Sequence, residues 1–112
     1  FLLRQSDRTI SIGYDEILFF ETSDNIHKIT LHARQRLLEF PGQLGDIEKE
    51  LDQRFYRCHR SYLVNLEHIQ TITPKTLIMS SRAELPIPRG RYNDIKDAYL
   101  EHAFQKEQVF LT

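Results

Sequence analysis

Short apolar runs separated by polar turns dominate the sequence, and this pattern restricts the chain to a fold built mainly of short strands. The stretch ILFFET at 17–22 contains a continuous apolar run, whereas TISIGY at 9–14 and HKITLHA at 27–33 alternate apolar and polar residues. Alternation with period two is typical of a strand with one buried face, and a short apolar run is typical of a buried strand. Similar runs occupy 1–5, 36–42, 60–65, 69–73, 76–80 and 84–88. We therefore predict a mainly β fold of small antiparallel sheets.

Two segments have helical rather than strand periodicity. Leu44, Ile47 and Leu51 are spaced at i, i+3 and i+7, which predicts a mid-chain helix over 43–52 with an acidic outer face. A second helix is predicted from about Arg89 to about Lys106. Its inner face would be formed by Ile95, Ala98, Tyr99, His102 and Ala103. A helix-turn-helix is disfavoured, because that motif needs two adjacent helices joined by a short turn.

The length and composition fit one compact domain with one main core. The chain has 112 residues, of which 40% are hydrophobic, and charged residues of both signs are mixed along it. No linker or repeat divides the sequence, so we predict one domain over 1–105, followed by a tail over 106–112. Because the chain begins at Phe1 and its first residues already resemble a strand, we expect it to be a domain of a longer protein.

Composition also narrows the setting. Fifteen Lys and Arg against 16 Asp and Glu give a net charge of −1, so a nucleic-acid signal has to be local. The only cysteine cannot form an intramolecular disulfide, which favours a reducing compartment. No apolar run approaches the roughly 20 residues that span a bilayer. We therefore expect a cytoplasmic location.

The only cysteine lies in RFYRCHRSYLVN (54–65), where Arg57, His59 and Arg60 surround Cys58. These neighbours allow three interpretations: a nucleophile with its base, a redox-responsive thiol, or a buried structural residue. Adjacent side chains on an extended chain point to opposite faces, which argues against a Cys58–His59 catalytic pair. The structural interpretation is favoured.

No other pattern indicates catalysis or a cofactor. His27 and His32 differ by an odd number along a predicted strand and so face opposite sides, and no cluster has metal-ligand spacing. A nucleophile elbow and a glycine-rich phosphate loop are both missing from the sequence. We predict neither an enzyme nor a metal or cofactor site.

Positive charge is concentrated in two segments that contain no acidic residue. The first, 53–66, carries three arginines and a histidine, and the second, 85–93, carries two arginines. The planar guanidinium fits both phosphate oxygens and the O6/N7 edge of guanine. Arg54 and Arg57 are equally explained by pairing with the acidic helix. For Arg60, Arg89 and Arg91 the sequence favours a DNA contact, because no acid is near in sequence and each is beside a turn.

The turn TSDNIHK (22–28) is a third candidate contact. Its small polar residues join two predicted strands, and it ends in His27 and Lys28. Histidine can donate to guanine N7 or O6, and lysine can neutralise a phosphate. Exposed polar turns are common, so the turn alone is a weak indication.

Three blocks together resemble the LytTR domain, the DNA-binding output domain of many bacterial response regulators. They are EILFFETSDNIHKITLH (16–32), RFYRCHRSYLVNLEHI (54–69) and LPIPRGRYNDIK (85–96), in the order found in the family. The first two are especially similar to regulators of the Agr and competence type, which serve peptide-pheromone quorum sensing. The resemblance implies about ten short strands in small antiparallel sheets with a mid-chain helix and a C-terminal helix.

The resemblance also implies a DNA-contact surface, with loops that enter successive major grooves on one side of the duplex. Base contacts are expected from His27, Arg91 and Arg60. Backbone contacts are expected from Lys28, Asn25, Ser61, Arg57, Arg89 and Tyr92. Position 60 is an asparagine in the most similar regulators, and Tyr92 and Asp94 also depart from the Agr-type pattern, so the cognate sequence is expected to differ. Cys58 matches a cysteine with a proposed redox role, but this chain has no second cysteine to pair with it.

The expected function is sequence-specific DNA binding in transcription control. A receiver domain of the same chain would be phosphorylated by a membrane histidine kinase, and phosphorylation would promote a dimer on direct-repeat DNA. The alternative is a protein-interaction module that docks an acidic partner through its arginine clusters.

Overall fold

The computed structural model describes residues 1–23 and 27–111, and the side chains of 1–22 and 27–105. The first half contains β1 (Leu2–Gln5), β2 (Arg8–Ser11), a 3-10 turn (Tyr14–Glu16), β3 (Ile17–Ser23), β4 (Lys28–Ala33), β5 (Leu37–Pro41) and α1 (Leu44–Glu50). The second half contains β6 (Phe55–His59), β7 (Tyr62–Asn65), a second 3-10 turn (Leu66–His68), β8 (Ile69–Ile72), β9 (Thr76–Met79), β10 (Glu84–Pro86) and α2 (Tyr92–Leu111). The prediction of a mainly β fold with two helices is confirmed.

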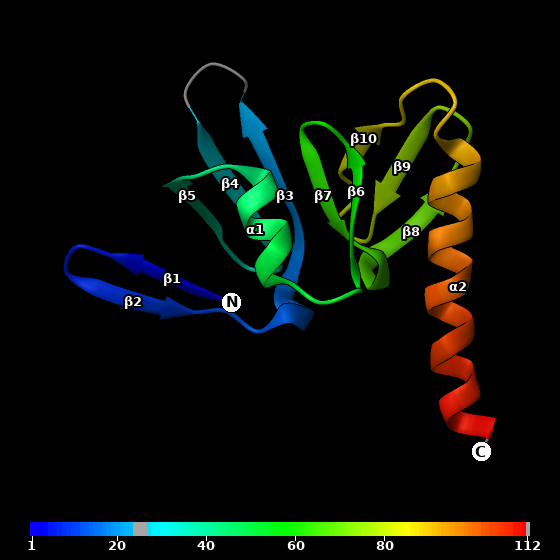
Figure 1. Ribbon diagram of the computed structural model, residues 1–112, viewed down its shortest axis with the longest axis horizontal. Helices are drawn as coiled ribbons and strands as arrows, with labels where there is room; N and C mark the ends of the chain where they lie inside the picture. Colours follow the sequence, from blue (N-terminus) through cyan, green and yellow to red (C-terminus); the bar gives the residue numbers. More distant parts are fainter. Residues whose placement is uncertain (24–26, 112) are drawn as a thin grey trace.

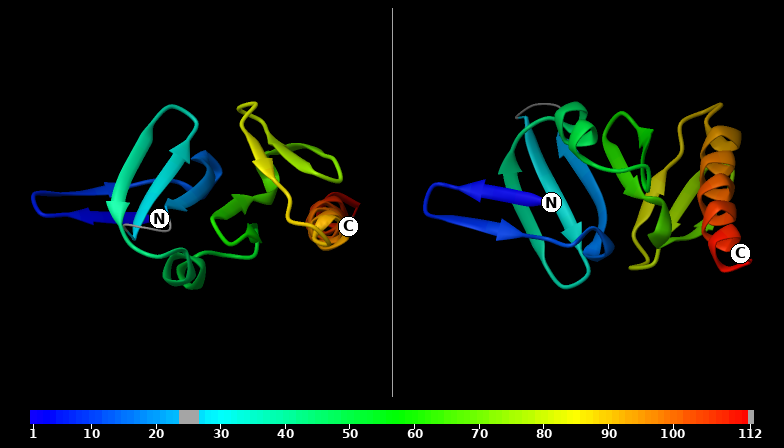
Figure 2. Two further views of the ribbon diagram at one scale, coloured as in Figure 1. Left: turned by 90° about the horizontal axis from the view of Figure 1, so that it is seen from above. Right: turned by 60° about the horizontal axis from the view of Figure 1, so that its bottom comes forward.

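In the described parts of the chain, the strands form three antiparallel sheets. The central sheet has the order β5-β4-β3-β7-β6, the second has the order β10-β9-β8, and the third consists of β1 and β2. In Figure 1 the β1–β2 hairpin extends from one end of the molecule and α2 lies at the other end. The two further views show α1 beside the central sheet and the β8–β10 sheet between that sheet and α2 (Figure 2).

The core is divided into two clusters, so the prediction of one main core is wrong. Phe20 pairs with Leu63 across β3 and β7 and belongs to the cluster that includes α1, while Phe19 pairs with Val64 and belongs to the cluster that includes the second sheet. Successive residues of a strand point to opposite faces, so both faces of the central sheet are covered. This explains why ILFF is continuously apolar.

Several element ends differ from the sequence prediction, and the strand β6 was not among the predicted runs. The strand predicted over 9–14 ends at Ser11, and a 3-10 turn begins at Tyr14 after the buried Ile12. The last helix continues to Leu111, beyond the predicted end near Lys106. Among the described residues, no helix combines the length and apolarity needed to cross a membrane.

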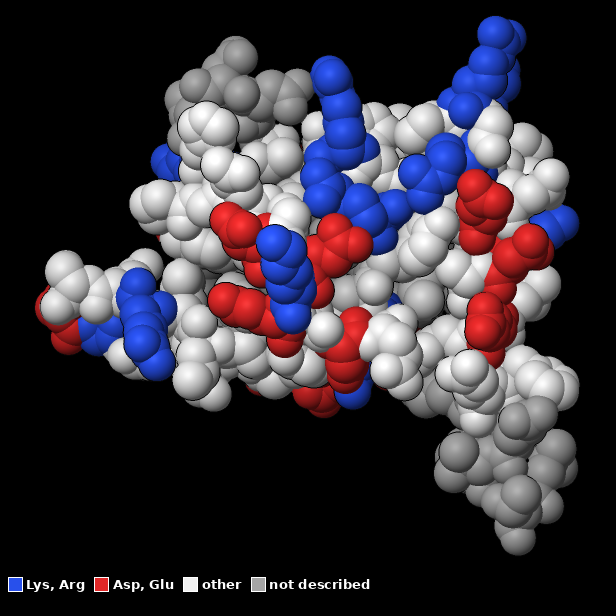
Figure 3. All heavy atoms as spheres, in the orientation of Figure 1, with Lys and Arg blue, Asp and Glu red and all other residues white. Residues whose placement is uncertain are grey.

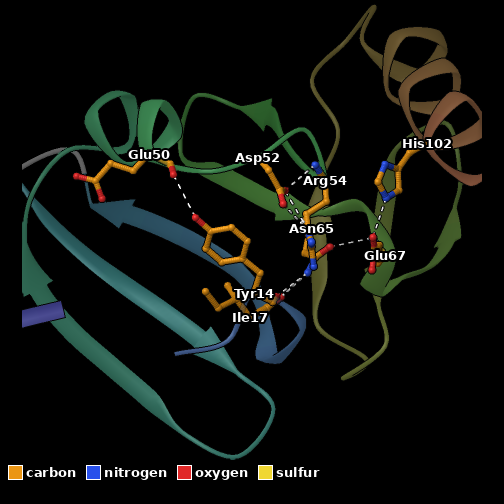
Figure 4. Close-up of polar contacts among 8 residues, drawn as sticks. All are labelled: Tyr14, Ile17, Glu50, Asp52, Arg54, Asn65, Glu67 and His102. Atoms are coloured by element: carbon orange, nitrogen blue, oxygen red, sulfur yellow. Dashed lines mark hydrogen bonds and ion pairs between the residues drawn. The ribbon is translucent and has the colours of Figure 1, made fainter. Parts of the chain in front are cut away.

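Polar contacts join the two halves of the domain near Asn65 (Figure 4). Asn65 is fully buried, and its Nδ2 donates to the carbonyl oxygens of Tyr14 (3.1 Å) and Ile17 (2.9 Å). Its Oδ1 accepts from the backbone N of Glu67 at 2.9 Å, and the Glu67 carboxylate in turn lies 2.8 Å from Nε2 of His102 on α2. A buried amide with its donors and acceptor occupied fixes the 3-10 turns against each other, and the pair with His102 attaches α2.

Candidate nucleic-acid interface

The three segments that the sequence singled out meet at one edge of the domain. The adjacent ends of β3 and β4, the β6–β7 turn and the loop before α2 all lie along the upper edge in Figure 1. Hydrogen bonds connect them: the backbone N of Thr22 donates to the Ser61 carbonyl at 3.0 Å, and Nη2 of Arg91 donates to the Arg57 carbonyl at 3.1 Å. Segments far apart in sequence therefore form one surface. We call this surface, which comprises 27–28, 57–61 and 89–94, the loop edge.

Basic side chains gather along the loop edge. On the face shown in Figure 3, Lys and Arg form a band along the top, and Asp and Glu lie below it over α1 and the first half of α2. The separation explains how a chain of net charge −1 can present a positive surface.

The β3–β4 turn contributes His27 and Lys28, whereas Asn25 lies outside the described residues. His27 is exposed with a positive φ of 46°, and its carbonyl oxygen accepts from the backbone N of Gly42 at 2.8 Å. The backbone contact fixes the base of the turn while the imidazole faces solvent. Nζ of Lys28 is 2.7 Å from Oε2 of Glu39 on β5, and both side chains are about half exposed.

Hydrogen bonds from the Arg57 side chain stabilise the β6–β7 turn. Its Nε donates to the His59 carbonyl at 3.1 Å, its Nη2 donates to the Arg60 carbonyl at 2.7 Å, and its Nη1 donates to Glu48 of α1 at 3.4 Å. The pairing with the acidic helix that the sequence left open is therefore present, and a phosphate contact from Arg57 stays a prediction. Arg60 is exposed at the tip of the turn.

Arg54 and Ser61 also contact neighbours within the domain. Nε of Arg54 bonds both carboxylate oxygens of Asp52 at 3.1 Å. The backbone N of Ser61 donates to Nδ1 of His59 at 2.9 Å, which places the half-buried Ser61 beside Arg60 on the loop edge.

The third segment places Arg91 immediately before α2. Arg91 N donates to the Pro88 carbonyl at 3.0 Å, and between them Gly90 has φ 85°, a conformation that glycine adopts without strain. Arg89 is exposed in this turn, and the ring of Tyr92 lies 5.1 Å from Nζ of Lys96. The turn therefore fixes the backbone position from which the Arg91 side chain extends.

Arg91 is anchored to β6 and to α2 rather than extended into solvent. Its Nη2 donates to the hydroxyl of Tyr56 at 3.0 Å as well as to the Arg57 carbonyl, and its Nε is 3.7 Å from Oδ2 of Asp94. The expectation that no acid is near Arg91 in sequence is wrong, because Asp94 follows one helical turn later and forms this ion pair. Sequence reasoning also missed Tyr56 and Glu39, since no local pattern pairs residues from different strands.

Cys58 is fully buried beneath the loop edge, as the structural interpretation predicted. Burial raises the pKa of its thiol to about 12, and the backbone hydrogen bond and the nearby charges of Arg91 and Arg57 only partly oppose this effect. A thiol that stays protonated and inaccessible is a weak nucleophile. Within the described residues, no group of three or more His, Cys, Asp or Glu could hold a metal ion.

We expect the folded domain to resist alkylation at Cys58. With a pKa near 12, only about one thiol in 10,000 is ionised at pH 8, so iodoacetamide should label the native protein far more slowly than the protein in denaturant. Mass spectrometry of timed samples measures the difference. Equal labelling rates would contradict the burial of Cys58.

The same raised pKa gives a dependence of stability on pH. The folded state holds the thiol proton more tightly than the unfolded state, so this stabilisation is present below about pH 9 and is lost as the pH rises toward 12. Cys58→Ala is the control: the stability difference between wild type and this variant in urea unfolding should shrink between pH 8 and about pH 10.5.

The structure defines the class of this protein. It is a mainly β domain with basic loops along one edge and no helix-turn-helix among its described elements. A family model for the LytTr DNA-binding domain matches residues 7–99, which is most of the chain. The chain belongs to this family.

Relatives and a solved structure agree with the assignment. The chain is 38% identical over 77 residues to accessory gene regulator protein A of Staphylococcus aureus and 36% identical to that of Staphylococcus epidermidis, in each case over 69% of this chain. It spans about a third of the length of these relatives. The fold resembles a LytTr DNA-binding domain of a Bacillus cereus response regulator with a TM-score of 0.71, at 25% identity, covering 89% of this chain and 94% of that one.

Proposed function

We propose that this domain binds double-stranded DNA sequence-specifically and is the output domain of a response regulator that controls transcription. The observation that carries the proposal is the convergence of three separate basic segments on the loop edge (Figures 1 and 3). Membership of the LytTr family and similarity to accessory gene regulator protein A support the same function.

Within this proposal, the chemistry of each side chain assigns it a role in DNA binding. His27, Arg60 and Arg91 read base edges, because imidazole and guanidinium groups match the acceptors of guanine in the major groove. Lys28, Asn25, Ser61, Arg57, Arg89 and Tyr92 contact the sugar-phosphate backbone and fix the register of the domain. The three segments follow one another along the longest axis of the domain (Figure 1), as contacts in successive major grooves on one side of the duplex would require.

The wider assembly is proposed from the relatives. A receiver domain of the same chain, phosphorylated by a membrane histidine kinase, would promote dimerisation in the cytoplasm. Two domains on a direct repeat would then bind more tightly than one, because the second contact is made at high effective concentration. Similarity to the accessory gene regulators favours peptide-pheromone quorum sensing as the pathway.

Selection from a random duplex pool tests the proposal. Repeated capture by the purified domain should enrich a common sequence, and the enriched duplex should bind more tightly than a scrambled version. Salt should weaken binding steeply, because phosphate contacts release counterions. Equal binding of the enriched and scrambled duplexes would contradict sequence-specific recognition. Retention of an acidic protein partner without any DNA shift would favour the interaction module instead.

Lys28 and Glu39 supply a matched pair of variants with opposite expected effects. Lys28→Ala should weaken binding to enriched and scrambled duplexes by similar factors and reduce the salt slope by about 1, because one phosphate contact is lost. Glu39→Gln should strengthen binding to both, because it removes the acid that pairs with Lys28 at 2.7 Å. Stability should change little in either variant, since exposed ion pairs contribute about 0–1 kcal/mol. Fluorescence anisotropy at several salt concentrations measures both effects, and a loss confined to the enriched duplex in Lys28→Ala would contradict the backbone role.

A further inference from the structure

Arg91 is held in a defined position by two residues of another element, the strand β6. Both N–H bonds of its Nη2 are directed to acceptors on β6, the Tyr56 hydroxyl at 3.0 Å and the Arg57 carbonyl at 3.1 Å. The guanidinium carbon also lies 5.8 Å from the centre of the Tyr56 ring. The two acceptors on β6 thus fix the Nη2 end of the guanidinium.

The remaining donors of Arg91 define what it can do. Its Nε is buried and makes no hydrogen bond among the described residues, and Asp94 lies at 3.7 Å, too far for one. Nη1 likewise makes no hydrogen bond to the described part of the chain, while 37% of the side chain is exposed. The anchored geometry therefore leaves Nη1, with its two N–H bonds, for an acceptor outside the domain.

We propose that Tyr56 is a positioning residue for base recognition: its hydroxyl holds Arg91 so that Nη1 faces the DNA. This inference rests on the proposed function, and it assigns a role to a side chain that does not itself touch the base. An unanchored arginine would lose rotamer freedom on binding, whereas one held before binding loses less and is restricted to one direction. The β6 anchor should therefore add both affinity and discrimination.

The chemistry of the anchor gives a single-atom test. Tyr56→Phe removes the hydroxyl acceptor but keeps the ring beside the guanidinium. Tyr99→Phe is the control, because Tyr99 is half-buried on α2 and its hydroxyl makes no hydrogen bond to the described residues. Binding is measured to the enriched duplex and to a duplex in which the base pair that depends on Arg91 is changed.

We expect Tyr56→Phe to lower the ratio of the two affinities about 3- to 10-fold, the range for losing one hydrogen bond, and Tyr99→Phe to leave it unchanged. In an Arg91→Ala background, Tyr56→Phe should have no further effect on the ratio, because the group it positions is missing. Thermal unfolding of each variant measures any purely structural contribution separately.

Two results would overturn the inference: an unchanged ratio, with or without an equal loss of affinity for both duplexes, or the same loss of the ratio in the Arg91→Ala background. Either result would mean that Tyr56 does not position Arg91 for base recognition. A wild-type domain that binds both duplexes equally would overturn the proposed function itself, and this inference with it.

Discussion

Replacing Arg91 by alanine is expected to abolish discrimination at one base pair while leaving non-specific binding largely intact. A well-placed arginine contact to guanine contributes about 1–3 kcal/mol to discrimination, so affinity for the enriched duplex should fall about 5- to 150-fold. Affinity for a scrambled duplex should fall much less, since the other basic groups for which we propose phosphate contacts are unchanged. Anisotropy competition between the two duplexes measures the change.

A second substitution at Arg91 separates charge from geometry, and Arg34→Ala is a control at a distant position. Arg91→Lys keeps the charge but lacks the planar fork, so it should lose discrimination and retain non-specific affinity. Arg34→Ala removes an exposed arginine from the β4–β5 turn, at the other end of β4 from the loop edge, and should leave discrimination unchanged. A similar loss of affinity for both duplexes in Arg91→Ala would contradict base reading by Arg91.

The largest effect on stability is expected from Phe20→Ala in β3. Phe20 is fully buried, and its ring lies 5.4 Å from that of Phe1 and 6.1 Å from that of Phe55. Truncating a buried phenylalanine costs about 3–5 kcal/mol, a large part of the roughly 5–15 kcal/mol that stabilises a domain. The thermal midpoint should fall by more than about 10 °C in a chain of this size.

Phe104→Ala is the control for this loss. Phe104 is 58% exposed on α2, so the same truncation there should change stability by less than about 0.5 kcal/mol. Circular dichroism during heating measures both midpoints. Equal shifts for the two variants would contradict the central position of Phe20.

The strands and helices were largely predictable, because alternation reports directly which positions are buried. The division of the core was not. ILFF indicates only that both faces of a strand are covered, whereas the assignment of Phe19 and Phe20 to different clusters depends on which elements pack on each face. Periodicity carries no information about that choice.

The site shows the same limit at the level of side chains. The sequence could place His27, Arg60 and Arg91 beside turns, and the resemblance could group them. Neither the sequence nor the resemblance could pair Lys28 with Glu39 or Arg91 with Tyr56, because these contacts depend on strand register and on where α2 begins. The ion pair between Arg91 and Asp94 was within reach, since Asp94 follows Arg91 by three positions, a spacing at which helical side chains meet.

Amide chemical shifts measured during DNA titration test the central claim that the loop edge is the DNA interface. With the isotope-labelled domain and the enriched duplex, the largest shifts are predicted at 27–28, 57–61 and 89–94. Amides at the opposite ends of the strands, 34–36 and 80–82, should change little, and added salt should reverse the shifts. Large shifts at 34–36 and 80–82, or at α1, together with little change at the loop edge would contradict the claim that the loop edge is the DNA interface.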